Sequence, residues 1–102
     1  SIWENEDLIG CGAIKILGEN HGEFKSIRVH DRFREKGFGK KIISILVSKS
    51  RDIRLKNIFI ETGSGNFFKP ARKLFKSCGF EECDPFGHYK NDPNSCYMKI
   101  NI

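Results

Sequence analysis

The sequence lacks the segments by which membrane and secreted proteins are recognised. No apolar run approaches the ~20 residues that a helix needs to span a bilayer. The first ten residues, SIWENEDLIG, are acidic and have neither the basic start nor the apolar centre of a signal peptide. We therefore expect a cytoplasmic protein without a membrane partner.

Disulfide and metal-ligand patterns are missing as well. The four cysteines, at positions 11, 78, 83 and 96, include no CxxC pair, and the three histidines, at positions 21, 30 and 88, form no ligand-spaced cluster with them. Free thiols in a reducing compartment are therefore favoured over disulfides. The same spacings predict that no metal is bound.

Length and composition indicate one ordinary globular domain. The 102 residues are 38% hydrophobic and 30% charged, without internal repeats or low-complexity tracts. We predict a single domain over residues 1–102. The net charge of +5 favours an anionic partner, which includes nucleic acids, phosphorylated cofactors and acidic membranes, and charge does not choose among them.

The order of strand and helix patterns predicts the fold class. Strand patterns occupy residues 2–3, 8–17 and 23–29; a helical period starts at Phe38; a short apolar strand follows at 58–61; a second helix opens at Pro70 and stops at Gly79; two strands close the chain at 80–83 and 95–100. The irregular alternation over 23–29 indicates a bulge. This order predicts an α/β fold with a mixed, mainly antiparallel sheet flanked by helices, in which a right-handed crossover through the first helix joins 23–29 to 58–61.

The basic stretch RFREKGFGKK, residues 32–41, contains two glycines where the first helix begins. Each glycine in a helix costs about 1 kcal/mol against alanine, so a close approach of another group to this backbone would explain them. The first N–H groups of a helix have no partner within it and bind phosphate readily. The spacing fits neither a P-loop nor GxGxxG. A nucleic-acid-binding domain is the weaker alternative, and we expect no nucleic-acid partner, because aromatic residues do not alternate with the basic ones as base stacking requires.

The residues around these glycines resemble a known family. VHDRFREKGFGKKI, residues 29–42, is similar to the acyl-CoA-binding signature of the GNAT superfamily of N-acetyltransferases, which reads Q or R, two residues, G, one residue, G or A. Arg34, Gly37 and Gly39 occupy its fixed positions. The resemblance continues through EFKSIRV before it and IFIETGS and FFKPARKLFKSCGF after it. The tail PFGHYKNDPNSCYM is similar to that of a subfamily of small bacterial members.

The resemblance implies a GNAT-like fold without its N-terminal strand and helices, and transfer of an acetyl group from acetyl-CoA, the cosubstrate, to a primary amine by direct attack. The CoA pyrophosphate would bind mostly to backbone N–H groups of residues 34–41. The backbone of residues 27–29 would pair with the pantetheine arm, and the N–H of Ile27 would lie near the acetyl carbonyl, where it could stabilise an oxyanion. The predicted cofactor-binding residues are Ile27, Arg28, Val29, Arg34, Glu35, Lys36, Gly37, Phe38, Gly39, Lys40 and Lys41.

Glu23 is the predicted catalytic residue. An amine is protonated near pH 7 and must lose a proton before it attacks a thioester. A carboxylate that faces the acetyl group through a water can take this proton, and burial makes a carboxylate a stronger base. Several GNAT enzymes have a glutamate at this distance before the glycine motif. Glu61, at the end of the next strand, is the competing base, and an ordinary surface glutamate is the alternative for Glu23.

Two departures from the family bear on activity. Many members have a tyrosine that protonates the departing CoA thiolate, and its place is taken by Phe75, which leaves solvent or Tyr89 as the proton source. The N-terminal wall of the acceptor site is also missing, so the chain is either a fragment or uses a partner chain, for which a homodimer is the candidate. A non-catalytic CoA-binding module is therefore the alternative function. The predicted acceptor is a small-molecule or peptide amine that contacts the loops.

Overall fold

The computed structural model describes residues 2–4, 7–29 and 37–102, with side chains for residues 12–25 and 37–102. The elements are β1 (Ile2–Glu4), β2 (Asp7–Gly18), β3 (His21–Val29), α1 (Phe38–Asp52), β4 (Asn57–Gly63), the 3-10 helix η2 (Asn66–Phe68), α2 (Lys69–Ser77), β5 (Glu81–Glu82) and β6 (Ser95–Asn101). The predicted order of strands and helices is confirmed, with η2 added. β5 is shorter than predicted, because the N–H of Phe80 donates to the carbonyl oxygen of Phe75 in α2 and not to a neighbouring strand.

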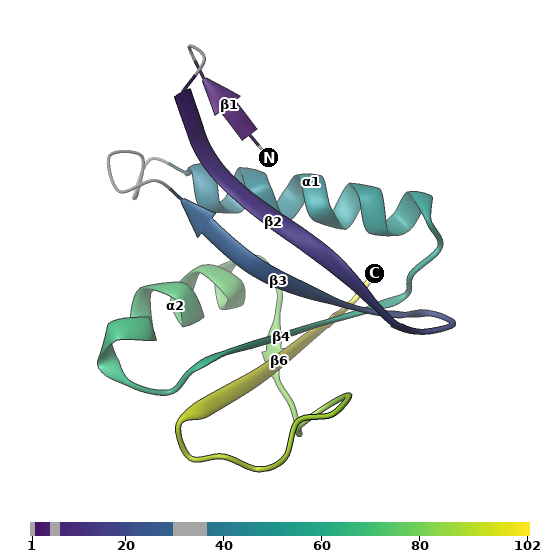
Figure 1. The fold of residues 1–102 in the computed structure, drawn as a ribbon, viewed down its shortest axis with the longest axis vertical. Coiled ribbons are helices and arrows are strands. Elements are labelled where there is room, and N and C mark those ends of the chain that lie inside the picture. Colours follow the sequence, from purple (N-terminus) through teal and green to yellow (C-terminus); the bar gives the residue numbers. More distant parts are fainter. Residues whose placement is uncertain (1, 5–6, 30–36) are drawn as a thin grey trace.

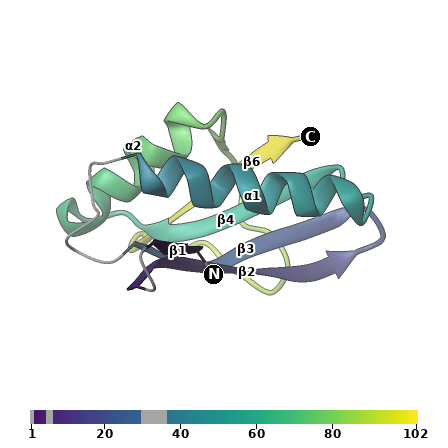
Figure 2. The ribbon, with the colours of Figure 1, turned by 90° about the horizontal axis from the view of Figure 1, so that it is seen from above.

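The strands form one sheet in the order β1-β2-β3-β4-β6-β5. β3 and β4 are parallel, and the other neighbouring strands are antiparallel. This confirms the predicted mixed, mainly antiparallel sheet. α1 connects the two parallel strands (Figure 1). Both helices lie on one face of the sheet (Figure 2). Neither of them has the length and apolar character needed to cross a membrane, and the same holds for every helix in the described ranges.

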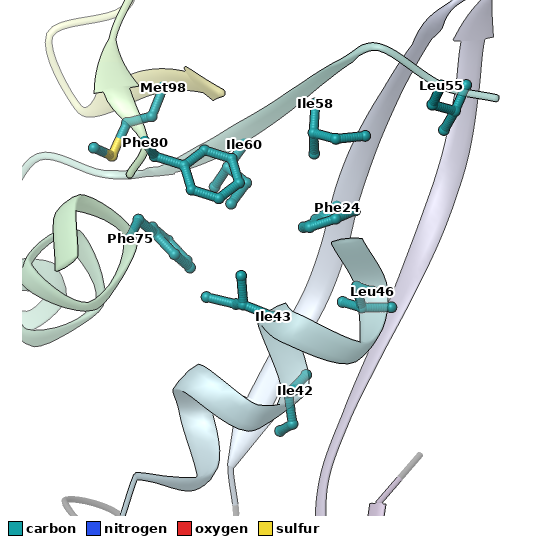
Figure 3. Packing of buried hydrophobic residues seen from close by; sticks show 10 residues of the cluster. All are labelled: Phe24, Ile42, Ile43, Leu46, Leu55, Ile58, Ile60, Phe75, Phe80 and Met98. Atoms are coloured by element: carbon teal, nitrogen blue, oxygen red, sulfur yellow. The ribbon is translucent and has the colours of Figure 1, made fainter. Parts of the chain in front are cut away.

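The core lies between this face of the sheet and the two helices (Figure 3). The helical period from Phe38 brings one apolar face of α1 onto the strands, and α2 adds a second contact. Full burial of each large apolar side chain contributes about 1.5–3 kcal/mol. The core side chains are Phe24, Ile42, Ile43, Leu46, Leu55, Ile58, Ile60, Phe75, Phe80 and Met98.

The segment between β5 and β6 packs on part of the opposite face of the sheet. Successive side chains of a strand point to opposite faces, so Glu23, which precedes the core residue Phe24, faces away from the helices. Phe59 lies between two core isoleucines and therefore also faces away from them. Its ring packs on Phe86 of the β5–β6 segment, with ring centroids 4.8 Å apart. This face thus carries a second, smaller layer of contacts beside Glu23.

β3 contains a bulge near its end. Cys11 pairs with Arg28, and Ala13 pairs with Lys25, so two steps along β2 match three steps along β3. The extra residue of β3 lies between Lys25 and Arg28, within the stretch of irregular alternation, and the predicted bulge is confirmed. A bulge bends a strand and increases its twist, which re-aims the backbone groups next to Ile27.

Gly39 lies in the first turn of α1 and faces α2. A Cβ atom at this position would lie 2.7 Å from Cδ2 and 3.3 Å from Cδ1 of Leu74. Real Cβ atoms do not make contacts this short, so a larger residue at position 39 requires the end of the Leu74 side chain to move. A close approach does explain Gly39, but the approaching group in the structure is Leu74.

In Gly39→Ala, overpacking of the new methyl group against Leu74 should cost about 1–3 kcal/mol and outweigh the roughly 1 kcal/mol that alanine gains over glycine in a helix, so the free energy of unfolding should fall by up to about 2 kcal/mol. In a Leu74→Ala background the same change should cost much less, which a double-mutant cycle measured by chemical denaturation will show. Gly65→Ala is the matched control: its φ is −72°, and nothing lies within 4 Å of its Cβ position. Additive effects of the two substitutions would contradict the packing explanation.

Candidate functional site

β3 and β4 separate partway along their length. Their pairing ends where Glu23 lies opposite Phe59. Beyond this point β4 stays paired with β6 as far as Gly63, whereas residues 24–29 of β3 form no ladder with β4 among the described residues. Figure 1 shows the two strands diverging from there. An open strand edge inside a sheet can pair with an extended ligand as an added strand.

The N-terminus of α1 lies at the same end of the sheet (Figure 1). Gly37, its N-cap, has φ +81°, which is left-handed backbone that other residues rarely adopt, and no atom of the described residues lies within 4 Å of its Cβ position. Within the described chain no side chain caps this helix, and its first turn contains no acidic residue. The helix dipole and the exposed Lys40 and Lys41 make this end positive.

The structure places two of the three predicted sets of cofactor-binding residues at the same end of the sheet. Residues 27–29 lie on the open edge of β3, although their side chains are outside the description, and residues 37–41 form the start of α1. Arg34, Glu35 and Lys36 lie outside the described residues. Gly39 has its own packing reason, whereas Gly37 has open space above it. The cofactor-binding roles of all these residues stay predictions.

Glu23 is almost completely buried, with 3% of its surface exposed. Its Oε2 accepts a hydrogen bond of 2.8 Å from the hydroxyl of Tyr89, in the segment between β5 and β6. Oε1 of Glu23 has no hydrogen-bond partner within the described residues. None of the fully buried side-chain oxygens in this part of the chain lacks a partner. Oε1 is therefore not fully buried and keeps contact with solvent. The alternative of an ordinary surface glutamate is therefore wrong.

Tyr89 is the residue of this site that sequence reasoning could not place. Burial, followed by the hydrogen bond to Glu23, raises the pKa of the Tyr89 hydroxyl well above its usual value, and the negative charges of Glu23 and Glu61 add to the effect. The hydroxyl is therefore a neutral donor over the whole ordinary pH range. A polar loop with one tyrosine carries no local signal for a contact with a strand 66 residues earlier.

Glu61 lies on the same face, two residues beyond Phe59 on β4. Its Oε2 accepts a hydrogen bond of 2.8 Å from the hydroxyl of Ser95. Because its charge acts on Tyr89, Glu61 faces the same region as Glu23, as predicted. It is only partly buried, which makes it the weaker candidate for a base that depends on burial.

Three of the four cysteines have described side chains, and two of these have raised thiol pKa values. Cys78, Cys83 and Cys96 are free thiols. Burial raises the pKa of the Cys83 and Cys96 thiols, which disfavours the nucleophilic thiolate. In the described part of the chain, no group of three or more His, Cys, Asp and Glu side chains could hold a metal ion.

Comparison with known proteins agrees with this arrangement. The model of the acetyltransferase (GNAT) family matches residues 1–80. The chain belongs to the GNAT family. The uncharacterized N-acetyltransferase YsnE of Bacillus subtilis is 42% identical over 98 residues, which cover 96% of this chain and 65% of that protein. YedL of Escherichia coli, also an uncharacterized N-acetyltransferase, is 33% identical over 102 residues, which cover 100% and 64%.

A solved structure shows the same fold. The Bacillus subtilis acetyltransferase in complex with CoA superposes with a TM-score of 0.82 at 19% identity, over 98% of this GNAT chain and 73% of the other. The family resemblance and the GNAT-like fold class predicted from the sequence are thus confirmed. The chain spans slightly less than two thirds of the length of the two curated relatives.

The Tyr89 hydrogen bond can be tested by titration. The chain has two tyrosines, so Tyr97→Phe leaves Tyr89 as the single one. Its ultraviolet tyrosinate signal should appear well above about pH 10, where a free tyrosine ionises. Because the folded-state pKa is raised, stability from neutral Tyr89 should be present below about pH 10 and lost as the pH rises beyond it.

Adding Glu23→Gln should move this titration back towards about pH 10, because the negative charge is removed while an amide oxygen remains as acceptor. Ionisation of Tyr89 near pH 10 in the folded protein, unaffected by Glu23→Gln, would show that the two side chains do not interact.

Proposed function

We propose that this chain binds acetyl-CoA and transfers its acetyl group to a primary amine by direct attack. The observation that carries the proposal is the buried carboxylate of Glu23 at the point where β3 and β4 separate. A buried base, an open strand edge and the positive end of α1 then follow one another along β3. Acetyl-CoA supplies the activated acetyl group as a thioester.

The start of α1 fits the pyrophosphate of this cosubstrate. The Cβ position of Gly37 is open, so a phosphate oxygen can approach the backbone where a side chain would block it. The uncapped first turn offers N–H donors, and Lys40 and Lys41 add positive charge. On the open edge of β3, the backbone of Ile27, Arg28 and Val29 is proposed to pair with the pantetheine arm.

Glu23 is the proposed general base. The hydrogen bond from Tyr89 occupies Oε2, and Oε1 is left to accept a proton from the ammonium group of the acceptor, directly or through one water. Direct attack by the amine is favoured over an acyl-cysteine intermediate, because burial raises the pKa of the Cys83 and Cys96 thiols and so disfavours the thiolate.

A non-catalytic CoA-binding module is the second candidate. The observation that favours it is Phe75, which lies in the core with 5% of its surface exposed and packs on Phe80. No hydroxyl is therefore available from that position to protonate the CoA thiolate. A thiol-release screen with acetyl-CoA and glycine, spermidine, kanamycin and a tripeptide separates the candidates. Stabilisation by CoA without thiol release would select the module.

The acceptor, the compartment and the assembly follow as further parts of the proposal. We propose a small-molecule or peptide amine as acceptor, the cytoplasm as compartment, and a homodimer as the assembly in which a second copy lines the acceptor site. Sedimentation of the intact chain with and without CoA tests the homodimer. A monomer at concentrations that support full thiol release would exclude it.

The pyrophosphate site predicts different effects for two isosteric variants of Gly37. Asn and Asp both tolerate left-handed backbone, so Gly37→Asn and Gly37→Asp should fold. Gly37→Asp should bind CoA at least about 10-fold more weakly than Gly37→Asn in calorimetry, because a carboxylate then faces the phosphates. High salt should reduce the difference. Equal CoA affinities of the two variants would exclude a phosphate at this position.

The proposed base predicts a loss of rate without a loss of cosubstrate affinity. Glu23→Gln keeps the shape of the side chain and its acceptor for Tyr89, but it cannot take a proton, so kcat should fall ~10²-fold near neutral pH. The deficit should shrink at high pH, where the amine loses its proton in solution. Glu61→Gln is the matched control and should cost much less. A larger loss in Glu61→Gln than in Glu23→Gln would transfer the role to Glu61.

A further inference from the structure

The segment between β5 and β6 closes over Glu23 and carries a donor to it. Tyr89 extends one hydroxyl across the sheet face to Oε2 of Glu23, 2.8 Å away. The amine acceptor and the base of the proposed function both belong to this face, so the following inference rests on that function. The Tyr89 hydroxyl acts on the orientation and the charge state of the Glu23 carboxylate.

The ring of Tyr89 is held in place by other rings. Its centroid lies 5.0 Å from that of Phe86 in an edge-to-face contact and 5.6 Å from that of Tyr97. Phe86 and Tyr97 are both buried, and Phe86 also packs on Phe59 of β4. Such aromatic pairs contribute beyond the area they bury. The hydroxyl of Tyr89 therefore points to Glu23 from a rigid platform.

The loop backbone is tied to the same platform. The hydroxyl of Tyr97 donates a hydrogen bond of 2.7 Å to the carbonyl oxygen of Lys90, the residue after Tyr89. The N–H of Tyr89 donates to the carbonyl oxygen of Phe86 at 3.0 Å. At the far end of the loop, the N–H of Ser64 donates to the carbonyl oxygen of Asn94 at 3.0 Å. The position of Tyr89 is thus determined from both sides.

We propose that Tyr89 is the positioning residue of the base: its hydroxyl holds Glu23 in one orientation, stabilises the ionised carboxylate through Oε2, and leaves Oε1 as the atom that receives the proton. A hydrogen bond donated to a carboxylate favours the charged form. Without it, one of the two oxygens of the buried Glu23 carboxylate loses its hydrogen-bond donor, which makes the ionised form less stable. We therefore expect loss of the Tyr89 hydroxyl to move the pH dependence of the reaction.

Other charged and titratable groups also face Glu23. Lys15 is its cross-strand partner on β2, and residues two positions away on β3 point to the same face. Positive charges there favour the ionised carboxylate as Tyr89 does, whereas Glu61 opposes it. Among the residues with described side chains, these groups are Lys15 on β2, His21 and Lys25 on β3, and Glu61 on β4. Tyr97 of β6 acts on Tyr89 electrostatically, and His88 and Lys90 flank Tyr89 in the loop.

The test is the pH profile of kcat/KM for Tyr89→Phe, measured by thiol release from acetyl-CoA with the fastest of the four amines named above. The acidic limb of this profile reports the ionisation of the base in the free enzyme. It should move to higher pH by about one to two units, the size expected for a lost hydrogen bond to a charged group. Affinity for CoA should stay unchanged.

Tyr97→Phe is the matched control. It removes one hydroxyl from the same ring cluster, but that hydroxyl donates to the carbonyl of Lys90 and not to Glu23, and the ring at position 97 remains, so the acidic limb should move much less than in Tyr89→Phe. Histidines generally change charge between about pH 5 and 8, so both variants are also compared in a His21→Gln, His88→Gln background. An unmoved limb in Tyr89→Phe, or an equal movement in Tyr97→Phe, would overturn the inference.

A second altered protein keeps the hydroxyl of Tyr89 and tests the inference even if Tyr89→Phe does not fold. In the Tyr97→Phe background, fluorotyrosine incorporation changes Tyr89 alone. A fluorinated phenol is more acidic and donates a stronger hydrogen bond, so the acidic limb should move to lower pH, and an unmoved limb overturns the inference. If the wild-type chain releases no thiol with any amine, the proposed function fails and this role fails with it. A wild type that turns over with a limb insensitive to Tyr89 disproves only this role.

Discussion

The separation of two neighbouring parallel strands is the constraint on which the rest of the structure depends. Parallel strands normally satisfy one another's backbone groups along their shared length, and then no edge is left inside the sheet. Here the ladder between β3 and β4 ends at Glu23 and Phe59, while the helices continue to cover the core face beyond that point. The backbone of β3 is therefore open in the middle of the sheet, next to the positive end of α1. The bulge between Lys25 and Arg28 falls on this open stretch.

The buried carboxylate of Glu23, where the pairing of β3 and β4 ends, depends on the loop between β5 and β6 for its hydrogen bond. An unpaired carboxylate costs several kcal/mol to bury, so Glu23 needs a donor on the face that the helices do not cover. Tyr89 provides it, and the ring cluster around Phe86 and Tyr97 provides the apolar contacts that hold the loop down. When the loop packs on this face of the sheet, it therefore also provides the hydrogen-bond donor of Glu23.

The two glycines of the basic motif serve different physical purposes. Gly37 adopts left-handed backbone, φ +81°, and leaves open space where a side chain would stand. Gly39 lets α1 approach α2, because its Cβ position is filled by Leu74. Gly37 thus leaves the start of the helix backbone without a side chain, and Gly39 leaves room for the side chain of Leu74. A motif that is read as a ligand-binding pattern therefore also encodes a helix contact.

The sequence by itself determined the order of strands and helices, the apolar face of α1, the bulge in β3 and the family, since all of these depend on local periodicity, on spacing or on short motifs. It also marked Glu23 as the candidate base, but not its surroundings. Only the tertiary structure decided that Glu23 is buried, that Tyr89 is its partner, that Phe75 belongs to the core and that Leu74 explains Gly39. Each of these depends on strand register and on how separate elements pack, and contacts between distant residues leave no repeat in the local sequence from which they could be read.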